Sequence, residues 1–218
     1  MVWGSYKTIE TQQWTADYRT AKGQQKQITL PDGTTVKLNT ATAFDISFNG
    51  KSRLLSLREG EIQVHTATTS SQELKPLIVQ TQEAVLSPTE TNFTVRQYNE
   101  MTRVGIIKGP LKVTPKFANN AQGAFFDTGH QIELSSHAFL SDNALKSETT
   151  SWLDNMLAVH NMPLKQFIEE VSRYHRGRLR VSPDIANIDV SGAFPLQDIN
   201  IIFNMLSHTY PININSHL

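Results

Sequence analysis

Apolar and polar residues alternate from about Gln24 to Leu134, and this period of two constrains the fold more than any other feature of the chain. In FDISF, residues 44–48, the apolar side chains fall on one face of an extended chain, and they do so again in RLLSL, residues 53–57. Such segments recur at roughly 8–12-residue spacing, with turn residues between them. Short strands at this spacing predict an all-β fold.

The segment QITLPDGTTVKLNT, residues 27–40, predicts a β-hairpin. Asp32-Gly33 is a strong two-residue turn signal, and Pro31 fixes the backbone just before it. Apolar residues enter and leave this turn at every second position: Ile28, Leu30, Val36 and Leu38. We expect the strands of this hairpin to join a larger sheet and its polar turn to face solvent.

An internal repeat relates RLLSLREGEIQV, residues 53–64, to TRVGIIKGPLKV, residues 102–113. Gly60 aligns with Gly109, so each copy is a strand, a glycine corner and a second strand. One such unit cannot bury its apolar face alone, whereas stacked units can. The repeat predicts a stacked, twisted, solenoid-like antiparallel β sandwich, and a propeller is disfavoured by the small number of strands.

The pattern changes in the C-terminal third of the chain. Residues 135–150 are rich in Ser, Thr, Asn and His and predict a linker, whereas the period after Trp152 is 3.6. Residues 163–177 predict a helix that ends near Gly177, with a stripe of Leu164, Phe167, Ile168, Val171 and Tyr174. A second copy follows at residues 195–208, with Leu196, Ile199, Ile202, Phe203 and Leu206 on its stripe.

Short alternating segments flank both predicted helices. Strands are expected at residues 157–160 and 190–194 before the helices, and at 178–181 and 212–215 after them. The sequence therefore predicts a mainly β protein with a small α+β C-terminal subdomain that contains a pair of βαβ units.

Composition limits the possible functions. The chain carries 20 basic and 20 acidic residues, which disfavours a nucleic-acid or anionic-membrane surface that depends on a basic excess. It has no cysteine, so disulfides, thiol nucleophiles and cysteine metal sites are excluded. No run of 18 apolar residues is present, and the opening MVWGSYKTIE lacks the basic start and apolar stretch of a secretory signal.

Chemistry-bearing motifs are missing from the sequence. The seven histidines are scattered and form no HExxH pair, and no GxSxG, GxGxxG or Walker motif occurs. We therefore expect no enzymatic activity, no catalytic residue, no metal site and no cofactor. Two rival interpretations are a polysaccharide-cleaving enzyme on a stacked β scaffold, and a periplasmic structural or carbohydrate-binding β-solenoid protein.

Several motifs in order resemble one known family. TLPDGTTVKLNTAT, RLLSLREGEIQV, NFTVR, VGIIKGPLKVTP and FDTGHQIEL are similar to the periplasmic part of FecR-type transmembrane sigma-factor regulators. Trp152, LAV, MPLKQFIEEVSRY, LRV and VSGAF resemble the C-terminal half of the same family, a secretin and TonB short N-terminal (STN-like) module. The resemblance covers nearly the whole chain.

The resemblance implies a domain order. Residues 1–22 would be a juxtamembrane stretch, 23–134 the FecR-type all-β subdomain, 135–151 a linker and 152–218 the STN-like subdomain. It also implies a periplasmic location, as part of a single-pass inner-membrane protein whose membrane helix and sigma-factor-binding cytoplasmic segment lie outside this sequence.

The resemblance implies a partner as well. Such regulators, of anti-sigma type, bind the N-terminal signalling domain of a TonB-dependent siderophore transporter and relay iron-uptake signals across the inner membrane. Many members carry Gly-Thr before the Phe-x-Val strand, and some cleave themselves there. Here the pair is Glu90-Thr91, so we expect no self-cleavage. A second departure is Asn155, where the family often has Gly; Asn also tolerates the left-handed conformation.

We expect the partner to dock on an open sheet edge of the STN-like subdomain, because an edge strand offers unpaired backbone groups. The candidate edges are residues 178–181 (Arg178, Leu179, Arg180 and Val181) and residues 212–215 (Ile212, Asn213, Ile214 and Asn215). The two arginines alternate with apolar residues, so one face would suit an acidic partner. An ordinary strand with solvated arginines is the alternative.

Overall fold

The computed structural model describes residues 16–49, 52–67, 75–118 and 123–215. The chain divides into two compact units, Met1–Leu145 and Lys146–Leu218. Of the expected juxtamembrane stretch, residues 1–15 lie outside the described residues.

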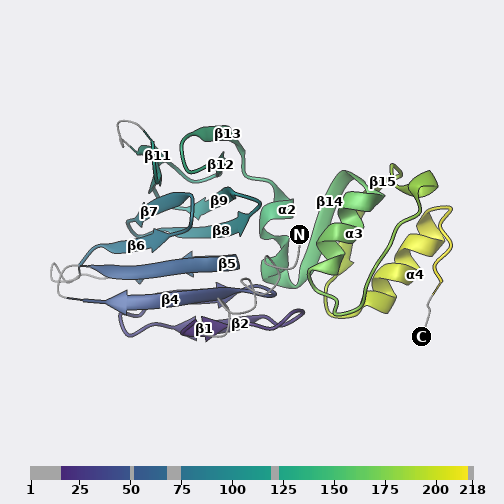
Figure 1. The fold of residues 1–218 in the computed structure, drawn as a ribbon, viewed down its shortest axis with the longest axis horizontal. Helices are drawn as coiled ribbons and strands as arrows, with labels where there is room; N and C mark the ends of the chain where they lie inside the picture. Colours follow the sequence, from purple (N-terminus) through teal and green to yellow (C-terminus); the bar gives the residue numbers. More distant parts are fainter. Residues whose placement is uncertain (1–15, 50–51, 68–74, 119–122, 216–218) are drawn as a thin grey trace, which may run out of the picture. The chain divides into compact units, whose positions relative to one another are not determined.

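The N-terminal unit forms one continuous 13-stranded sheet that curls over itself (Figure 1). Its strands are β1 (Tyr18–Arg19), β2 (Lys26–Thr29), β3 (Thr35–Leu38), β4 (Ala43–Phe48), β5 (Arg53–His65), β6 (Leu77–Gln80), β7 (Ala84–Pro88), β8 (Asn92–Tyr98), β9 (Met101–Lys108), β10 (Leu111–Pro115), β11 (Ala124–Phe126), β12 (His130–Leu134) and β13 (Phe139–Ala144).

Strand β5 belongs to both layers of the sandwich. Its first half, up to Glu59, pairs with β4 and β6, and its second half, from Gly60, pairs with β3 and β8. One layer then continues through β7 and β10 to β11, and the other through β9 and β12 to β13. The predicted mainly β sandwich is confirmed, and β5 joins its layers covalently.

Buried residues line up across neighbouring strands of the sandwich. One such row crosses five strands through directly paired, fully buried side chains: Leu38, Ile62, Val95, Val104 and Ile132. Burying an aliphatic side chain of this size contributes roughly 1.5–3 kcal/mol. Each strand therefore depends on its neighbours for a covered face, as the repeat predicted.

The glycine corners of the repeat are real. Gly60 and Gly109 have φ angles of 92° and 81°, in the left-handed region that favours glycine. A Cβ on Gly60 would overlap Thr42 Oγ1 and the carbonyl oxygen of Ala41. A Cβ on Gly109 would overlap the carbonyl oxygen of Glu90. Both corners therefore require glycine for its conformation and for its size.

The same offset of 49 residues relates the turns that pack against these corners. Ala41 and Glu90 both have positive φ, 47° and 48°. The following threonines, Thr42 and Thr91, each direct the side-chain hydroxyl to the carbonyl oxygen two residues earlier, at 3.2 and 3.0 Å. The repeat thus begins twelve residues before the sequence match, at Ala41 rather than Arg53 and at Glu90 rather than Thr102.

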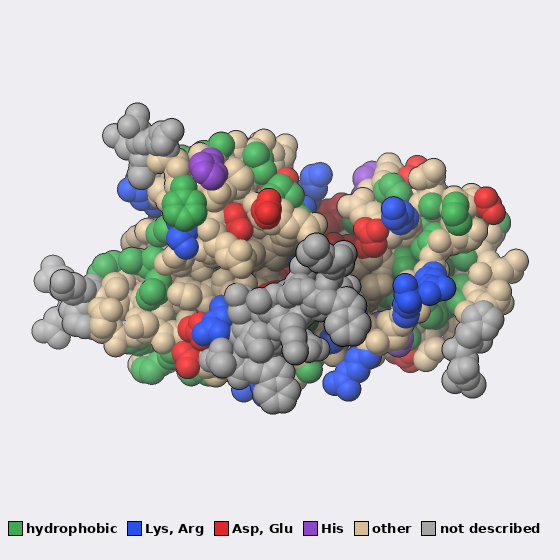
Figure 2. Space-filling view, viewed as in Figure 1, with side chains coloured by type: hydrophobic (Ala, Val, Ile, Leu, Met, Phe, Trp, Pro, Cys, Tyr) green, Lys and Arg blue, Asp and Glu red, His purple; other side chains and the backbone are tan. Residues whose placement is uncertain are grey.

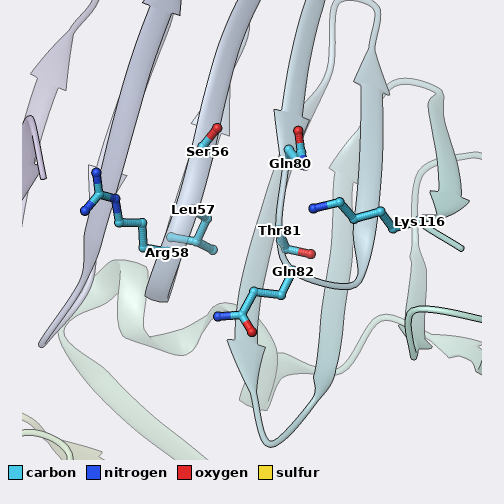
Figure 3. A pocket seen from close by; sticks show the side chains of 7 residues that line it. All are labelled: Ser56, Leu57, Arg58, Gln80, Thr81, Gln82 and Lys116. Carbon is cyan, nitrogen blue, oxygen red and sulfur yellow. The ribbon is translucent and has the colours of Figure 1, made fainter. Parts of the chain in front are cut away.

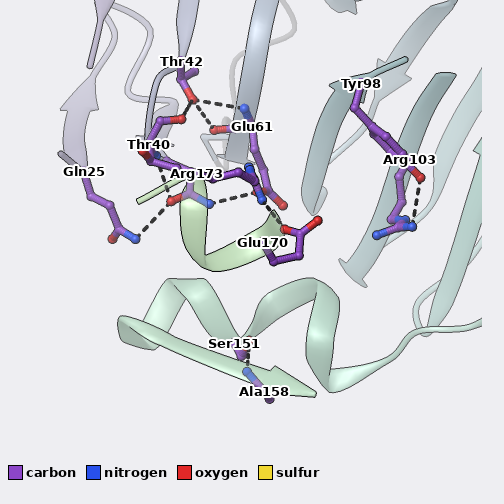
Figure 4. Close-up of polar contacts among 11 residues, drawn as sticks. Gln25, Thr40, Thr42, Glu61, Tyr98, Arg103, Ser151, Ala158, Glu170 and Arg173 are labelled. Carbon is purple, nitrogen blue, oxygen red and sulfur yellow. Dashed lines mark hydrogen bonds and ion pairs between the residues drawn. The ribbon is translucent and has the colours of Figure 1, made fainter. Parts of the chain in front are cut away.

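Two carboxylates are buried in the sandwich, one of them next to the Gly60 corner. Glu61 is 4% exposed; its Oε2 accepts a hydrogen bond from Asn39 at 2.9 Å and its N–H donates to Thr42 Oγ1 (Figure 4). Glu83 is equally buried and accepts a hydrogen bond from Thr102 Oγ1 at 2.8 Å. A buried carboxylate is tolerated only when its oxygens are paired in this way.

The predicted hairpin is formed by β2 and β3, but its turn is not fully solvated. Asp32 accepts hydrogen bonds from the N–H and hydroxyl of Thr34 and forms an ion pair with Arg53. Its side chain is only 4% exposed. The expectation of a solvent-facing turn is wrong for Asp32, because the carboxylate closes the turn and binds the adjacent strand.

The predicted linker contains a strand. Residues 139–144 form β13, which pairs antiparallel with β12, and Phe139 packs edge-to-face on Phe126 with ring centroids 5.5 Å apart. The polar composition reflects an edge strand whose residues are mostly exposed, and pairing there is made by the backbone.

The C-terminal unit is a small subdomain of helices and strands. Its elements are α2 (Ser147–Thr150), η1 (Ser151–Asp154), β14 (Met156–Pro163), α3 (Leu164–Ser172), η2 (Pro183–Ile185), β15 (Asp189–Pro195) and α4 (Ile199–Thr209). Strands β14 and β15 pair antiparallel, with a bulge after Val159. Asn155 has φ 58° and ends η1, so asparagine does take the left-handed position.

Both predicted helices and the strands before them are confirmed. Their stripes, except Tyr174, form the core, with Phe167 and Phe194 in edge-to-face contact. The strands expected after the helices are wrong, because residues 178–181 and 212–215 are irregular. Gly177 does not end α3, which stops at Ser172. No helix among the described residues is long and apolar enough to cross a bilayer.

A buried threonine gives a first prediction. Thr94 is 1% exposed, and its hydroxyl has no hydrogen-bond partner among the described residues, whereas the equally buried Thr102 donates to Glu83. Thr94→Val should raise the free energy of unfolding by about 1 kcal/mol, because it removes an unpaired polar group. Thr102→Val should lower it by about 1–3 kcal/mol. Urea denaturation measures both, and equal effects would contradict the assignment.

A second prediction separates conformation from crowding at the glycine corner. Gly60→Ala and Gly129→Ala both place alanine at positive φ, but a Cβ at Gly129 meets nothing within 4 Å. Gly129→Ala should cost about 1 kcal/mol of stability, and Gly60→Ala should cost at least 2 kcal/mol more than that, on the order of an overpacked core. Thermal unfolding followed by circular dichroism measures the difference; a similar cost at both sites would show that Thr42 does not enforce the corner.

Candidate functional site

Residues 178–181 run between α3 and η2 as a drawn-out segment without regular structure (Figure 1). Leu179 and Val181 are partly buried and pack against the core of the C-terminal unit. Arg178 and Arg180 are exposed. The side chains therefore alternate between core and solvent as they would in a strand, although no strand is present.

The backbone of this segment is unpaired. None of the residues 178–181 makes a hydrogen bond to another described residue, through either backbone or side chain. Four consecutive residues with free N–H and C=O groups are unusual in a folded unit, where most such groups find partners. This arrangement can accept an added strand.

The second candidate edge is less open. Ile212 is 8% exposed, belongs to the same core as Leu179, and donates its N–H to the carbonyl oxygen of Tyr210 at 2.7 Å. Asn213, Ile214 and Asn215 are exposed. The structure thus gathers Leu179, Val181 and Ile212 on one core, and the two segments differ in that Ile212 is buried and bonded to Tyr210, whereas none of residues 178–181 is bonded to a described residue.

Side chains cover part of the true sheet edges. On β14, the N–H of Ala158 donates to Ser151 Oγ at 3.0 Å (Figure 4). On β15, the N–H of Ser191 donates to Tyr210 Oη at 2.9 Å, and that hydroxyl also reaches the Ser191 carbonyl oxygen at 3.3 Å. An incoming strand would have to displace these bonds, which makes β14 and β15 poorer docking edges than residues 178–181.

The charge of the segment is strongly positive. Arg176, Arg178 and Arg180 are exposed, and none of the three has an ion-pair partner among the described residues. Arg173, in the turn after α3, differs because it bonds to Glu170 at 3.0 Å (Figure 4). Three cations at every second position form a surface that an anionic partner can neutralise.

Sequence reasoning missed an apolar strip on α4. Ile201 is 46% exposed and Met205 is 37% exposed, and a spacing of four residues places both on one helical face. The buried residues Ile202 and Leu206 lie on the neighbouring face. The signal was present, because Ile201 and Met205 are apolar residues that fall outside the predicted stripe.

One titratable cluster lies in the N-terminal unit. Arg103 bonds to Glu133 Oε1 at 2.7 Å. It also bonds to Tyr98 Oη at 2.9 Å (Figure 4). Burial raises the pKa of Tyr98 despite the nearby Arg103. Burial also disfavours the ionised Glu133, but the hydrogen bonds and charge of Arg103 outweigh it and lower the pKa of that carboxyl. Both groups are thus held in their ordinary neutral-pH forms, and the cluster joins β8, β9 and β12 as a structural bridge.

A polar pocket of about 440 Å³ opens on the same unit (Figure 3). It is lined by Ser56, Leu57, Arg58, Gln80, Thr81, Gln82 and Lys116. Arg58 is already paired with Asp45, so Lys116 is the pocket's cation without a carboxylate partner among the described residues. Among all the residues that the structure describes, no group of three or more His, Asp or Glu side chains could hold a metal ion.

Comparison with known proteins agrees with this architecture. Residues 16–112 match the family model described as FecR protein. Two crystal structures of a candidate anti-sigma factor from Parabacteroides distasonis, at 2.50 and 1.65 Å resolution, have the same fold, with TM-scores of 0.72 and 0.73. Each is 22% identical and aligns over 92% of this chain and 93% or 94% of its own.

No curated protein sequence matches this chain. Residues 16–112 are thus similar to the FecR protein family, and the fold of the two crystal structures extends along nearly the entire chain.

Proposed function

We propose that this chain is the periplasmic signal-receiving part of an anti-sigma-type regulator. Its partner would be the N-terminal signalling domain of a TonB-dependent siderophore transporter, and a cytoplasmic segment outside this sequence would hold the sigma factor. Binding in the periplasm would pass an iron-uptake signal through a single membrane helix. The unpaired segment at residues 178–181 is the observation that supports this proposal most directly.

Docking would occur by strand addition. A strand from the transporter domain would pair with the free backbone of residues 178–181, while Leu179 and Val181 stay packed on the core. The N–H and C=O groups would then gain the partners that they lack in the isolated chain. The binding site is thus formed by a segment that is extended but still unpaired.

The partner strand would carry acidic side chains at alternate positions. Arg178 and Arg180 project on the side away from the core, so carboxylates two residues apart would face them in register. Arg–carboxylate pairs are strong and directional because both groups are planar and can form two hydrogen bonds. The exposed strip of Ile201 and Met205 on α4 offers an apolar contact in the same unit. Figure 2 shows blue and green side chains interspersed on the viewed face of this unit.

The N-terminal unit would serve as a rigid spacer or as a shield for the segment near the membrane. Its layers are locked together by β5 and by two glycine corners, which suits a part that transmits position without changing shape. The alternative function, carbohydrate binding by a periplasmic β protein, is favoured only by the polar pocket around Lys116. That pocket has no aromatic side chain in its lining on which a sugar ring could stack.

The strand-addition model predicts the effect of proline in the segment. Arg180→Pro should leave the unfolding temperature nearly unchanged, because the N–H that it removes makes no hydrogen bond in the structure. Val181→Pro, tested as a separate variant, removes the next N–H along the segment. Because successive N–H groups of an extended chain point to opposite sides, one of the two variants removes an N–H that faces the incoming strand. At least one of the two should weaken binding of the purified transporter domain by tenfold or more, measured by calorimetry on the full chain.

Charge reversal tests the acidic partner. Arg178→Glu with Arg180→Glu should weaken binding at least as strongly as the proline variants, because like charges would meet across the strands. The matched control reverses two exposed lysines of the N-terminal unit, Lys22→Glu with Lys26→Glu, and should bind as the original chain does. Equal losses in both double variants would refute docking at residues 178–181.

The chain should not cleave itself at Glu90-Thr91. The Thr91 hydroxyl accepts from the Thr89 N–H at 3.1 Å and is surrounded by the carbonyl oxygens of Thr89 and Pro110, none of which can take its proton. Attack on the Glu90 carbonyl would need a base at that point. Intact mass spectrometry after prolonged incubation should give one species for the original chain and for Thr91→Ala. Fragments 1–90 and 91–218 from the original chain alone would contradict this.

A further inference from the structure

We propose that the N-terminal unit rests on an anionic lipid surface through one edge of its sandwich, a role beyond the signalling function proposed above. The contact would be made by an aromatic-lysine stripe that consists of Phe117, Phe125, Lys112 and Lys116. These residues lie on β10, on β11 and directly after β10.

The stripe exposes large aromatic side chains. Phe125 is 73% exposed and Phe117 is 60% exposed, the two highest values among the exposed large hydrophobic residues of the described chain. On β13, where Phe139 packs against Phe126 of β11, Leu140 and Phe139 have exposures of 53% and 37%. Exposed apolar side chains of this size on a soluble protein often mark contact with a partner or a membrane.

Each phenylalanine carries a lysine beside its ring. The Lys112 Nζ lies 5.8 Å from the ring centroid of Phe125, and the Lys116 Nζ lies 5.9 Å from that of Phe117. Neither lysine has a carboxylate partner among the described residues. Rings that enter the headgroup boundary while ammonium groups meet lipid phosphates are the arrangement of interfacial membrane contacts.

The geometry is that of a stripe along one edge. Lys112 pairs directly with Phe125 across β10 and β11, and Lys116 and Phe117 lie in the turn that follows β10. Beyond β11 no further strand continues this layer in the described chain. Figure 2 shows green and blue side chains side by side over this end of the unit.

Charge favours lipid over a second copy of the chain. A symmetric dimer through this stripe would bring Lys112 and Lys116 against the same lysines of its mate, so like charges would be buried together. An anionic bilayer neutralises all of them at once. It also accepts both rings without requiring a matching pocket for each.

Vesicle sedimentation tests the proposal on the full chain. The chain should partition onto vesicles of equal parts phosphatidylcholine and phosphatidylglycerol, bind phosphatidylcholine alone much more weakly, and be released by high salt. Lys112→Gln with Lys116→Gln should reduce the partition coefficient about tenfold or more. Phe117→Ser with Phe125→Ser should produce a comparable loss at every salt concentration.

The control replaces a phenylalanine and a lysine elsewhere on the same unit. Phe48→Ser with Lys26→Gln changes a 37% exposed ring on β4 and an exposed lysine on β2, and should partition as the original chain does. Circular dichroism checks that every variant is folded. Absence of binding by the original chain, or equal loss in the control, would overturn the proposal. So would sedimentation velocity in which the stripe variants turn a dimer into a monomer without any change in vesicle binding.

Discussion

The passage of β5 from one layer to the other at Gly60 is the constraint on which the N-terminal unit depends. A single strand pairs with four neighbours, two in each layer, so both sheets take their register from it. The change of direction requires positive φ and a missing side chain, since Thr42 lies against the corner. Gly109 repeats the solution between β9 and β10. Because β5 sets the positions of its neighbouring strands, the alternation of apolar residues along each strand then determines which side chains pack between the two layers.

Much of this architecture could be predicted because it is local. The period of two, the glycine corners and the two helical stripes depend on neighbouring residues, and each appears in the structure. What failed depends on distant parts of the chain. Strand β13 looks like a linker because its pairing with β12 is made by backbone groups that carry no sequence pattern. The burial of Asp32 depends on Arg53, which is distant in sequence.

The candidate site also shows what a sequence pattern can and cannot predict. Residues 178–181 have the alternation of a strand, and the structure keeps that alternation while supplying no neighbour to pair with. A pattern of side chains specifies which face is buried, but a strand exists only when a second backbone is present. The sequence could therefore indicate the segment without revealing that it is unpaired. The outward face of α4 escaped notice because helical stripes direct attention to the buried side.

An unpaired extended segment is also a hazard, since two copies of a protein can pair through such segments and aggregate. The exposed arginines Arg176, Arg178 and Arg180 oppose such self-pairing. A symmetric pair of molecules joined at this segment would place three positive charges opposite three more, so crowding of the chain would not block residues 178–181. The same arginines that would attract an acidic partner strand would repel a second copy of this segment. Specificity for the partner would then come from repulsion between copies as much as from attraction to the partner.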